Sequence, residues 1–168
     1  MRTNPASFIE KFEAYTTQFD GNLWYKAGQS WPRWTREGVG AVNEAIEFLK
    51  KAESLPPFTW NDRLAEASEF HTDDIGPLGL LQHNSSDGTD PFTRMKRFGT
   101  YWSAGENISF GSRTAEDIVE ALFIDDGVPS RGHRNNIMSS TYKVVGNNNG
   151  SHAKYGVMTT LNYADKFD

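Results

Sequence analysis

Three short polar segments carry the side chains best suited to chemistry. Each places a titratable group beside glycine or other small residues: a histidine in the first, a glutamate in the second and a histidine in the third. Taken singly, each also has a structural interpretation as an exposed loop histidine, a strand-edge glutamate or a helix cap. The segments are Gln82–Gly88, Gly105–Ile108 and Arg131–Ile137.

Together these side chains would suit a divalent metal ion. The chain has no cysteine, which excludes disulfides and a zinc-thiolate site, so histidines and carboxylates are the ligands that remain. Neutral imidazole and carboxylate groups suit zinc and leave a position for water, which the metal acidifies. The alternative is a polar cleft whose groups satisfy one another. Calcium is a further alternative, although no EF-hand spacing occurs among the acids concerned, Asp87, Asp90, Asp125 and Asp126.

A hydrolase is the enzymatic alternative. Ser85, Ser86 and Ser130 lie near the histidines in sequence, but the chain has neither a Gly-x-Ser-x-Gly nor a His-Glu-x-x-His motif. In a metal-assisted version, His83 and His133 would be ligands and Glu106 the general base. Glu106 and His133 are therefore the candidate catalytic residues of that alternative. No motif indicates an organic cofactor.

The N-terminal third of the chain is predicted to be helical. A helix begins at Asn4-Pro5, where the amide side chain would cap it, and an aromatic stripe follows at helical spacing. Thr35 is predicted to cap a second helix that stops before Pro56. The stripe consists of Phe8, Phe12, Tyr15 and Phe19.

The remaining elements frame the three polar segments. A third helix begins at Asn61 or Asp62 and carries His71 as a hydrogen-bonded core residue, and a long loop covers 76–90. Asp90-Pro91 opens a short helix, and Thr114 and Asp117 form the capping box of another, which ends at 125–129. Two strands follow, Tyr142–Gly146 and Tyr155–Tyr163, joined by an Asn/Gly-rich turn that leaves His152 exposed.

Composition narrows the class of protein. The 168 residues suit one domain, and the aromatic content of 13% favours a compact globule. A net charge of −5 gives no basic footprint for nucleic acid. No apolar run approaches the ~20 residues of a transmembrane helix, and Met1–Pro5 shows no signal-peptide core.

In combination, the polar segments resemble the signature of the CAP superfamily, named after cysteine-rich secretory proteins, antigen 5 and pathogenesis-related 1 proteins. That signature has a loop histidine, a Gly-Glu-Asn-hydrophobic strand and a Gly-His-Arg-x-Asn-Ile segment, and the chain contains all three in this order. The resemblance covers nearly the whole chain. It implies an α/β fold, a three-layer α-β-α sandwich with a small, mostly antiparallel central sheet flanked by helices. Residues 1–168 would form a single SCP-like domain, with residues 1–55 as an N-terminal helical extension packed on the core.

The resemblance also implies a central cleft with two histidines and two acids. His83, Glu106 and His133 match three members of this set, and Asp125 stands where relatives carry a glutamate. Because aspartate is shorter by one methylene, Asp126 remains an alternative for the fourth. The implied metal ligands are His83, His133, Glu106 and Asp125.

For function, the resemblance implies a non-enzymatic binding or interaction module. Its cleft would hold zinc and bind a small apolar ligand, such as a lipid, or a protein partner. A structural role in a larger assembly is a further alternative to the hydrolase. Most relatives are secreted, so we expect an extracytoplasmic location, with the cytoplasm as the alternative because no leader is visible.

Overall fold

The computed structural model describes all residues from Met1 to Asp168. They form two compact units: a helical unit of residues 1–56 and 120–138, and a sheet unit of residues 57–119 and 139–168. Helix α5 (Ala115–Ile124) contributes residues to both units. That residues 1–55 are an extension on the core of a single domain stays a prediction.

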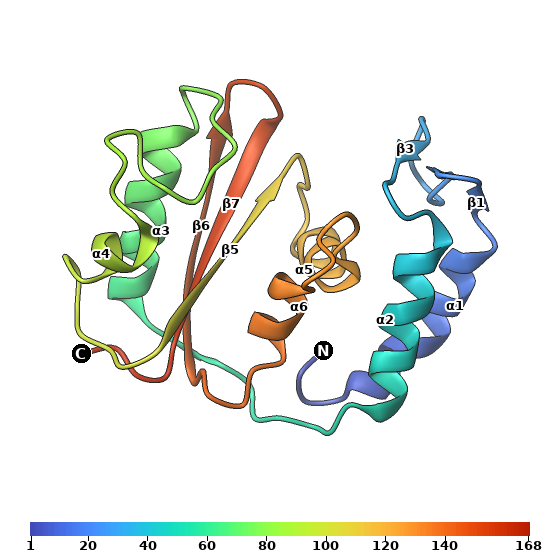
Figure 1. The fold of residues 1–168 in the computed structure, drawn as a ribbon, viewed down its shortest axis with the longest axis horizontal. Coiled ribbons are helices and arrows are strands. Elements are labelled where there is room, and N and C mark those ends of the chain that lie inside the picture. The colour runs from blue at the N-terminus through green and yellow to red at the C-terminus, as the bar shows by residue number, and fades with distance from the viewer. The chain divides into compact units, whose positions relative to one another are not determined.

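The helical unit is built around two helices that lie side by side, α1 (Ile9–Thr16) and α2 (Val39–Lys51) (Figure 1). Phe12 and Tyr15 of α1 are buried, and Phe12 packs edge-on against Phe123 of α5. The unit also contains a 3-10 turn, three short strands and a short helix. These are η1 (Pro5–Phe8), β1 (Phe19–Asp20), β2 (Leu23–Trp24), β3 (Arg33–Trp34) and α6 (Gly132–Ile137).

The two predicted N-terminal caps are wrong. The Asn4 side chain makes no capping hydrogen bond, and Pro5 begins a 3-10 turn that leads into α1. Thr35 donates from its hydroxyl to the carbonyl of Asn22 instead, and α2 begins four residues later, after Gly38. Gly38 has a φ of 58°, a conformation that glycine adopts without steric cost, so the backbone itself sets the start of the helix.

The sheet unit contains a four-stranded sheet in the order β4-β6-β7-β5. The short β4 pairs parallel to β6 and the other neighbours are antiparallel, which confirms a small, mostly antiparallel sheet. Helix α3 packs along β6 and β7, with the short α4 beside it (Figure 1). The bounds are β4 (Thr59–Trp60), α3 (Asp62–Ile75), α4 (Pro91–Met95), β5 (Ala104–Phe110), β6 (Val144–His152) and β7 (Gly156–Ala164).

Three predicted helix starts and the long loop are confirmed. The Asn61 side chain accepts from the Leu64 amide at 3.0 Å, and Asp90 accepts from the first amides of α4. Thr114 accepts from the Asp117 amide at the start of α5, which ends at Ile124 as predicted. Residues 76–90 contain no regular helix or strand. No helix has both the length and the apolar character needed to cross a membrane.

The prediction of an Asn/Gly turn before His152 is wrong. Asn147–Gly150 lies inside β6 and pairs with β7, and the chain reverses at residues 153–155. Backbone ladder hydrogen bonds and the bond from the Asn149 amide to the Thr159 hydroxyl hold this polar stretch extended. His152 is therefore buried rather than exposed.

The close contact between α3 and β6 depends on Gly146. A Cβ atom there would lie 2.2 Å from the Ala65 backbone nitrogen. We expect Gly146→Ala to destabilise the protein by about 1–3 kcal/mol, because backbone atoms would have to move. Gly40→Ala is the matched control, since a Cβ at that exposed helical position meets nothing within 4 Å. Urea unfolding measures both; equal stability of the two variants would contradict this packing.

Candidate functional site

The first site pair joins the long loop to β5. His83 Nδ1 lies 2.9 Å from Glu106 Oε1. The imidazole is half exposed, whereas the Glu106 side chain is buried. The loop therefore presents an accessible imidazole ring whose Nδ1 edge is fixed by a buried carboxylate.

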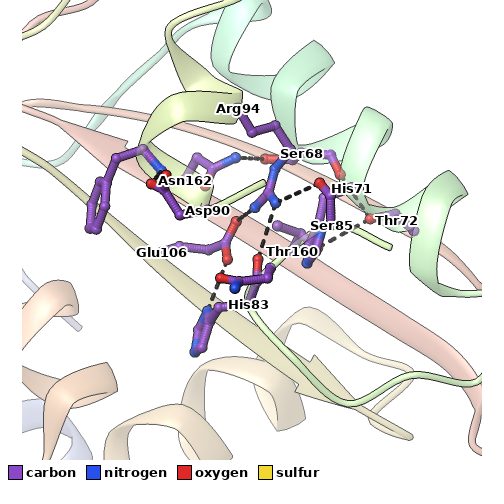
Figure 2. A network of polar contacts seen from close by, with 12 residues as sticks. Ser68, His71, Thr72, His83, Ser85, Asp90, Arg94, Glu106, Thr160 and Asn162 are labelled. Carbon is purple, nitrogen blue, oxygen red and sulfur yellow. Dashed lines mark hydrogen bonds and ion pairs between the residues drawn. The ribbon is translucent and has the colours of Figure 1, made fainter. Parts of the chain in front are cut away.

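Arg94 of α4 holds this pair in place, as Figure 2 shows. Its fully buried guanidinium pairs through Nη2 with Glu106 Oε2, and its Nη1 donates to the His83 carbonyl and the Ser85 hydroxyl. Both oxygens of Glu106 are thus engaged, one by arginine and one by histidine. Arg94 compensates the buried charge and fixes the loop backbone at His83 itself.

Sequence reasoning missed Arg94. The signal was available, because Glu106 shares one face of the strand with Ile108 and Phe110, and a carboxylate buried on that face requires a cation. The sequence does not say which basic residue supplies it. Arg94 follows the Asp90-Pro91 helix start by one turn, which directs it to the sheet.

Two buried histidines anchor the loop that carries His83. His71 Nε2 donates to the Gln82 carbonyl at 3.2 Å, which confirms it as a hydrogen-bonded core residue. His152 Nε2 donates to the Leu80 carbonyl at 3.1 Å, while its Nδ1 accepts two backbone N–H groups. Burial lowers the pKa of His71, so that imidazole is neutral.

The neighbouring serines do not form a nucleophile–base pair with His83. Ser85 accepts from Arg94, and the Ser86 hydroxyl donates to Asp74. Hydrogen bonds of its serine side chains, as well as of its backbone, therefore hold the loop in place.

The second site pair belongs to the helical unit. His133 Nδ1 lies 2.6 Å from Asp125 Oδ1, and the His133 amide donates to Asp125 Oδ2 at 2.9 Å. Asp125 is buried, and His133 is partly exposed. Asp126 instead accepts the backbone amides of Arg36 and Glu37, so Asp125 is the acid that pairs with histidine.

Arg131 and Arg134 shape the turn that presents this pair. Asp125 and Arg131 both have positive φ, 60° and 52°, a conformation that costs a non-glycine residue about 1–2 kcal/mol. Arg131 offsets this cost by donating to the Asp125 carbonyl and pairing with Glu37 and Glu44. Arg134 donates to the Phe123 and Ile124 carbonyls at the end of α5.

The described geometry is thus two histidine–carboxylate pairs, one in each unit. Within either unit, no three His, Asp or Glu side chains cluster as ligands of one metal ion. In both pairs the carboxylate binds Nδ1, so a metal ion or substrate would meet the imidazole at Nε2. That the four groups share one cleft stays a prediction.

Comparison with known proteins identifies the family. The family model described as "CAP: Cysteine-rich secretory protein family" matches residues 35–163. This chain belongs to the CAP family. Its glutamate-bearing strand and both paired histidines lie inside the matched segment.

Bacterial CAP relatives share part of the sequence and the fold. The uncharacterized protein YkwD of Bacillus subtilis is 31% identical over 113 residues, covering 64% of this chain and 42% of the relative. An extracellular protein containing an SCP domain from Bacillus anthracis superposes with a TM-score of 0.56 at 21% identity, over 67% of this chain and 35% of its own. An outer surface protein of Borrelia burgdorferi gives 0.57 at 17% identity, over 73% and 86%. This chain thus spans less than half of the first two proteins, and the structural likeness shows the CAP fold.

The Arg94–Glu106 ion pair can be tested by removing one partner. We expect Arg94→Leu to cost about 3–5 kcal/mol, because it leaves a buried carboxylate without its cation. The double variant Arg94→Leu/Glu106→Leu should recover much of that loss. Arg97→Leu is the control, since Arg97 lies three residues further along the chain and its side chain is nearly half exposed. Denaturant unfolding measures all three; a double variant no better than Arg94→Leu would contradict the assignment.

The Arg131 cluster predicts acid sensitivity. Hydrogen bonds from Arg131, and then from the Gly127 amide, lower the pKa of Glu37 from 4.5 to about 2. A lowered folded-state pKa contributes stability above pH 4.5 that is lost as the pH falls toward 2. We expect Glu37→Gln to lose up to about 1 kcal/mol at pH 7, because partial exposure screens the charge, and to lose less than wild type on acidification.

Thermal unfolding from pH 7 to 2 measures this difference. The exposed Glu53 gives the control variant Glu53→Gln. Parallel pH curves for wild type and Glu37→Gln would refute the prediction.

Proposed function

We propose that this CAP domain is a non-enzymatic, extracytoplasmic binding module in which the accessible imidazoles of His83 and His133 bind a divalent metal ion. The observation that supports this is the common construction of the two pairs. Each accessible imidazole has Nδ1 fixed by a buried carboxylate, at 2.9 Å for Glu106 and 2.6 Å for Asp125. This is the carboxylate–histidine arrangement that orients Nε2 toward metals in proteins.

In both pairs the imidazole suits a metal ion better than the carboxylate does. Glu106 is engaged by Arg94 and His83, and Asp125 by His133 and the amides at the start of α6. The carboxylates therefore suit the role of orienting groups better than that of direct ligands. Zinc bound by imidazole would keep positions for water or for an acceptor group of the bound partner.

The same contacts favour binding over hydrolysis. A general base needs a lone pair directed at the substrate proton, but Glu106 directs its oxygens to Arg94 and His83. Ser85 and Ser86 bond to Arg94 and Asp74. The binding partner in this proposal is a small apolar ligand or a protein.

The location rests on the neighbouring structures. The SCP-domain protein of Bacillus anthracis is described as extracellular, and the Borrelia burgdorferi protein as an outer surface protein. A cysteine-free CAP domain on the outer side of a membrane would gain stability from its ion pairs and core in place of disulfides.

Zinc titration tests the metal site. We expect wild type to bind Zn²⁺, and His83→Ala and His133→Ala each to weaken binding at least tenfold because each removes a proposed ligand. Glu106→Gln should weaken it about 10–100-fold through loss of imidazole orientation. Isothermal titration calorimetry of tag-free protein measures these affinities.

One control variant makes the titration decisive. Glu47→Gln removes an exposed carboxylate that pairs with Lys50 and should bind as wild type. Unchanged zinc affinity in both histidine variants would reject the metal proposal. A peptide and ester turnover that requires Glu106 would replace the binding proposal with the hydrolase.

A further inference from the structure

A small aromatic pocket in the helical unit takes no part in the histidine–carboxylate pairs. It has a volume of about 90 Å³ and lies among β1, β2, β3, α2 and the end of α5. Phe19 and Trp24 form one wall, Val42 and Ile124 line the interior, and Trp34 and Arg33 complete it.

The aromatic wall is fixed before any ligand arrives. Phe19 and Trp24 stack at 5.4 Å with an interplanar angle of 9°. The indole N–H of Trp24 donates to Gln18 at 3.1 Å, and Lys26 lies over the same ring while it pairs with the buried Glu120. Binding here would cost little ordering of the wall.

The lining of the pocket includes an exposed tryptophan and an exposed arginine. Trp34 lines the pocket and is still 68% exposed. Arg33 is exposed beside it, and Asp126, the acid that lines the pocket, already accepts two backbone amides. Residues 21–36 contain Lys26, Arg33 and Arg36 but no acid, although the whole chain has a net charge of −5.

Four of the ten residues that line the pocket precede the family match, which begins at residue 35: Phe19, Trp24, Arg33 and Trp34. The other six lie within the match. None of the paired histidines and carboxylates lines the pocket, so its ligand is a separate question from that of the two pairs.

We propose that this pocket binds an acidic, N-acetylated sugar unit of a glycan. The sugar ring would stack on the exposed face of Trp34, since the electron-rich face of an aromatic ring attracts polarised C–H groups. The carboxylate would pair with Arg33, whose planar guanidinium suits bidentate contact.

The size of the cavity favours this class of ligand. A volume of about 90 Å³ corresponds to about three water molecules at ~30 Å³ each, enough for an acetyl group. It is well below the ~300 Å³ at which pockets begin to enclose whole drug-sized ligands. An acyl chain or sterol would not fit, whereas a sugar can place one substituent inside and leave the polymer in solvent.

Four monosaccharides separate the contributions of the acetyl group and of the carboxylate to binding. N-acetylmuramic acid carries both the acetyl group and a carboxylate, N-acetylglucosamine lacks the carboxylate, glucuronic acid lacks the acetyl group, and glucose lacks both. We expect saturable binding of N-acetylmuramic acid at millimolar concentration, roughly tenfold weaker binding of each single-group sugar, and none of glucose. Saturation-transfer NMR and calorimetry at low salt measure these affinities.

Variants locate the binding. Trp34→Ala should abolish binding, and Arg33→Gln should make the acidic and neutral acetylated sugars bind equally. Trp102→Ala is the matched control, because Trp102 is 85% exposed and lies in the sheet unit. His83→Ala, which removes a proposed metal ligand, should bind sugar as wild type, so the two proposals fail independently.

Three outcomes would overturn the proposal. They are the absence of saturable N-acetylmuramic acid binding, unchanged binding by folded Trp34→Ala, and an unchanged acidic preference in Arg33→Gln. Should Trp34→Ala not fold, as judged by circular dichroism, Arg33→Gln decides the result. Trp34-dependent binding to phosphatidylglycerol vesicles without sugar binding would assign the surface to a membrane instead.

Discussion

The buried ion pair between Arg94 and Glu106 is the interaction on which the sheet unit depends. Removing two charges from water costs several kcal/mol per ion, and only close pairing with further hydrogen bonds repays it. Here those further bonds go to the His83 carbonyl, the Ser85 hydroxyl and the His83 ring. The electrostatic requirement of one buried glutamate therefore determines the position of the loop that presents the imidazole.

The helical unit orients its histidine by another route. No arginine pairs with the Asp125 carboxylate in the contacts described above; backbone amides of His133 and Arg134 bond to Oδ2 while Oδ1 binds the ring. This turn requires an unfavourable backbone conformation, because Asp125 and Arg131 both adopt positive φ. Arg131 then ties the turn to Glu37 and Glu44 of the N-terminal segment. Strain stored at a site and offset by surrounding contacts is typical of functional turns.

Local signals predicted much of this architecture. Asn61, Asp90 and Thr114 cap the helices that the sequence indicated, because a capping side chain acts on amides two or three residues away. The choice of Asp125 over Asp126 and the role of Arg94 depend on tertiary contacts, which spacing alone does not contain. The Asn/Gly stretch of β6 was misjudged because its pairing partner, β7, outweighs the low strand propensity of those residues.

The four histidines fall into two groups, according to whether the ring bonds to a backbone carbonyl or to a carboxylate. His71 and His152 are buried and donate from Nε2 to loop carbonyls, and Nδ1 of His152 also accepts backbone N–H groups. His83 and His133 are accessible and turn Nδ1 toward carboxylates, so Nε2 is the ring nitrogen directed away from the carboxylate. The buried pair fixes the backbone of the loop at residues 80 and 82, immediately before His83. Histidines thus supply both the hydrogen bonds that support the loop and the accessible imidazole that the loop presents.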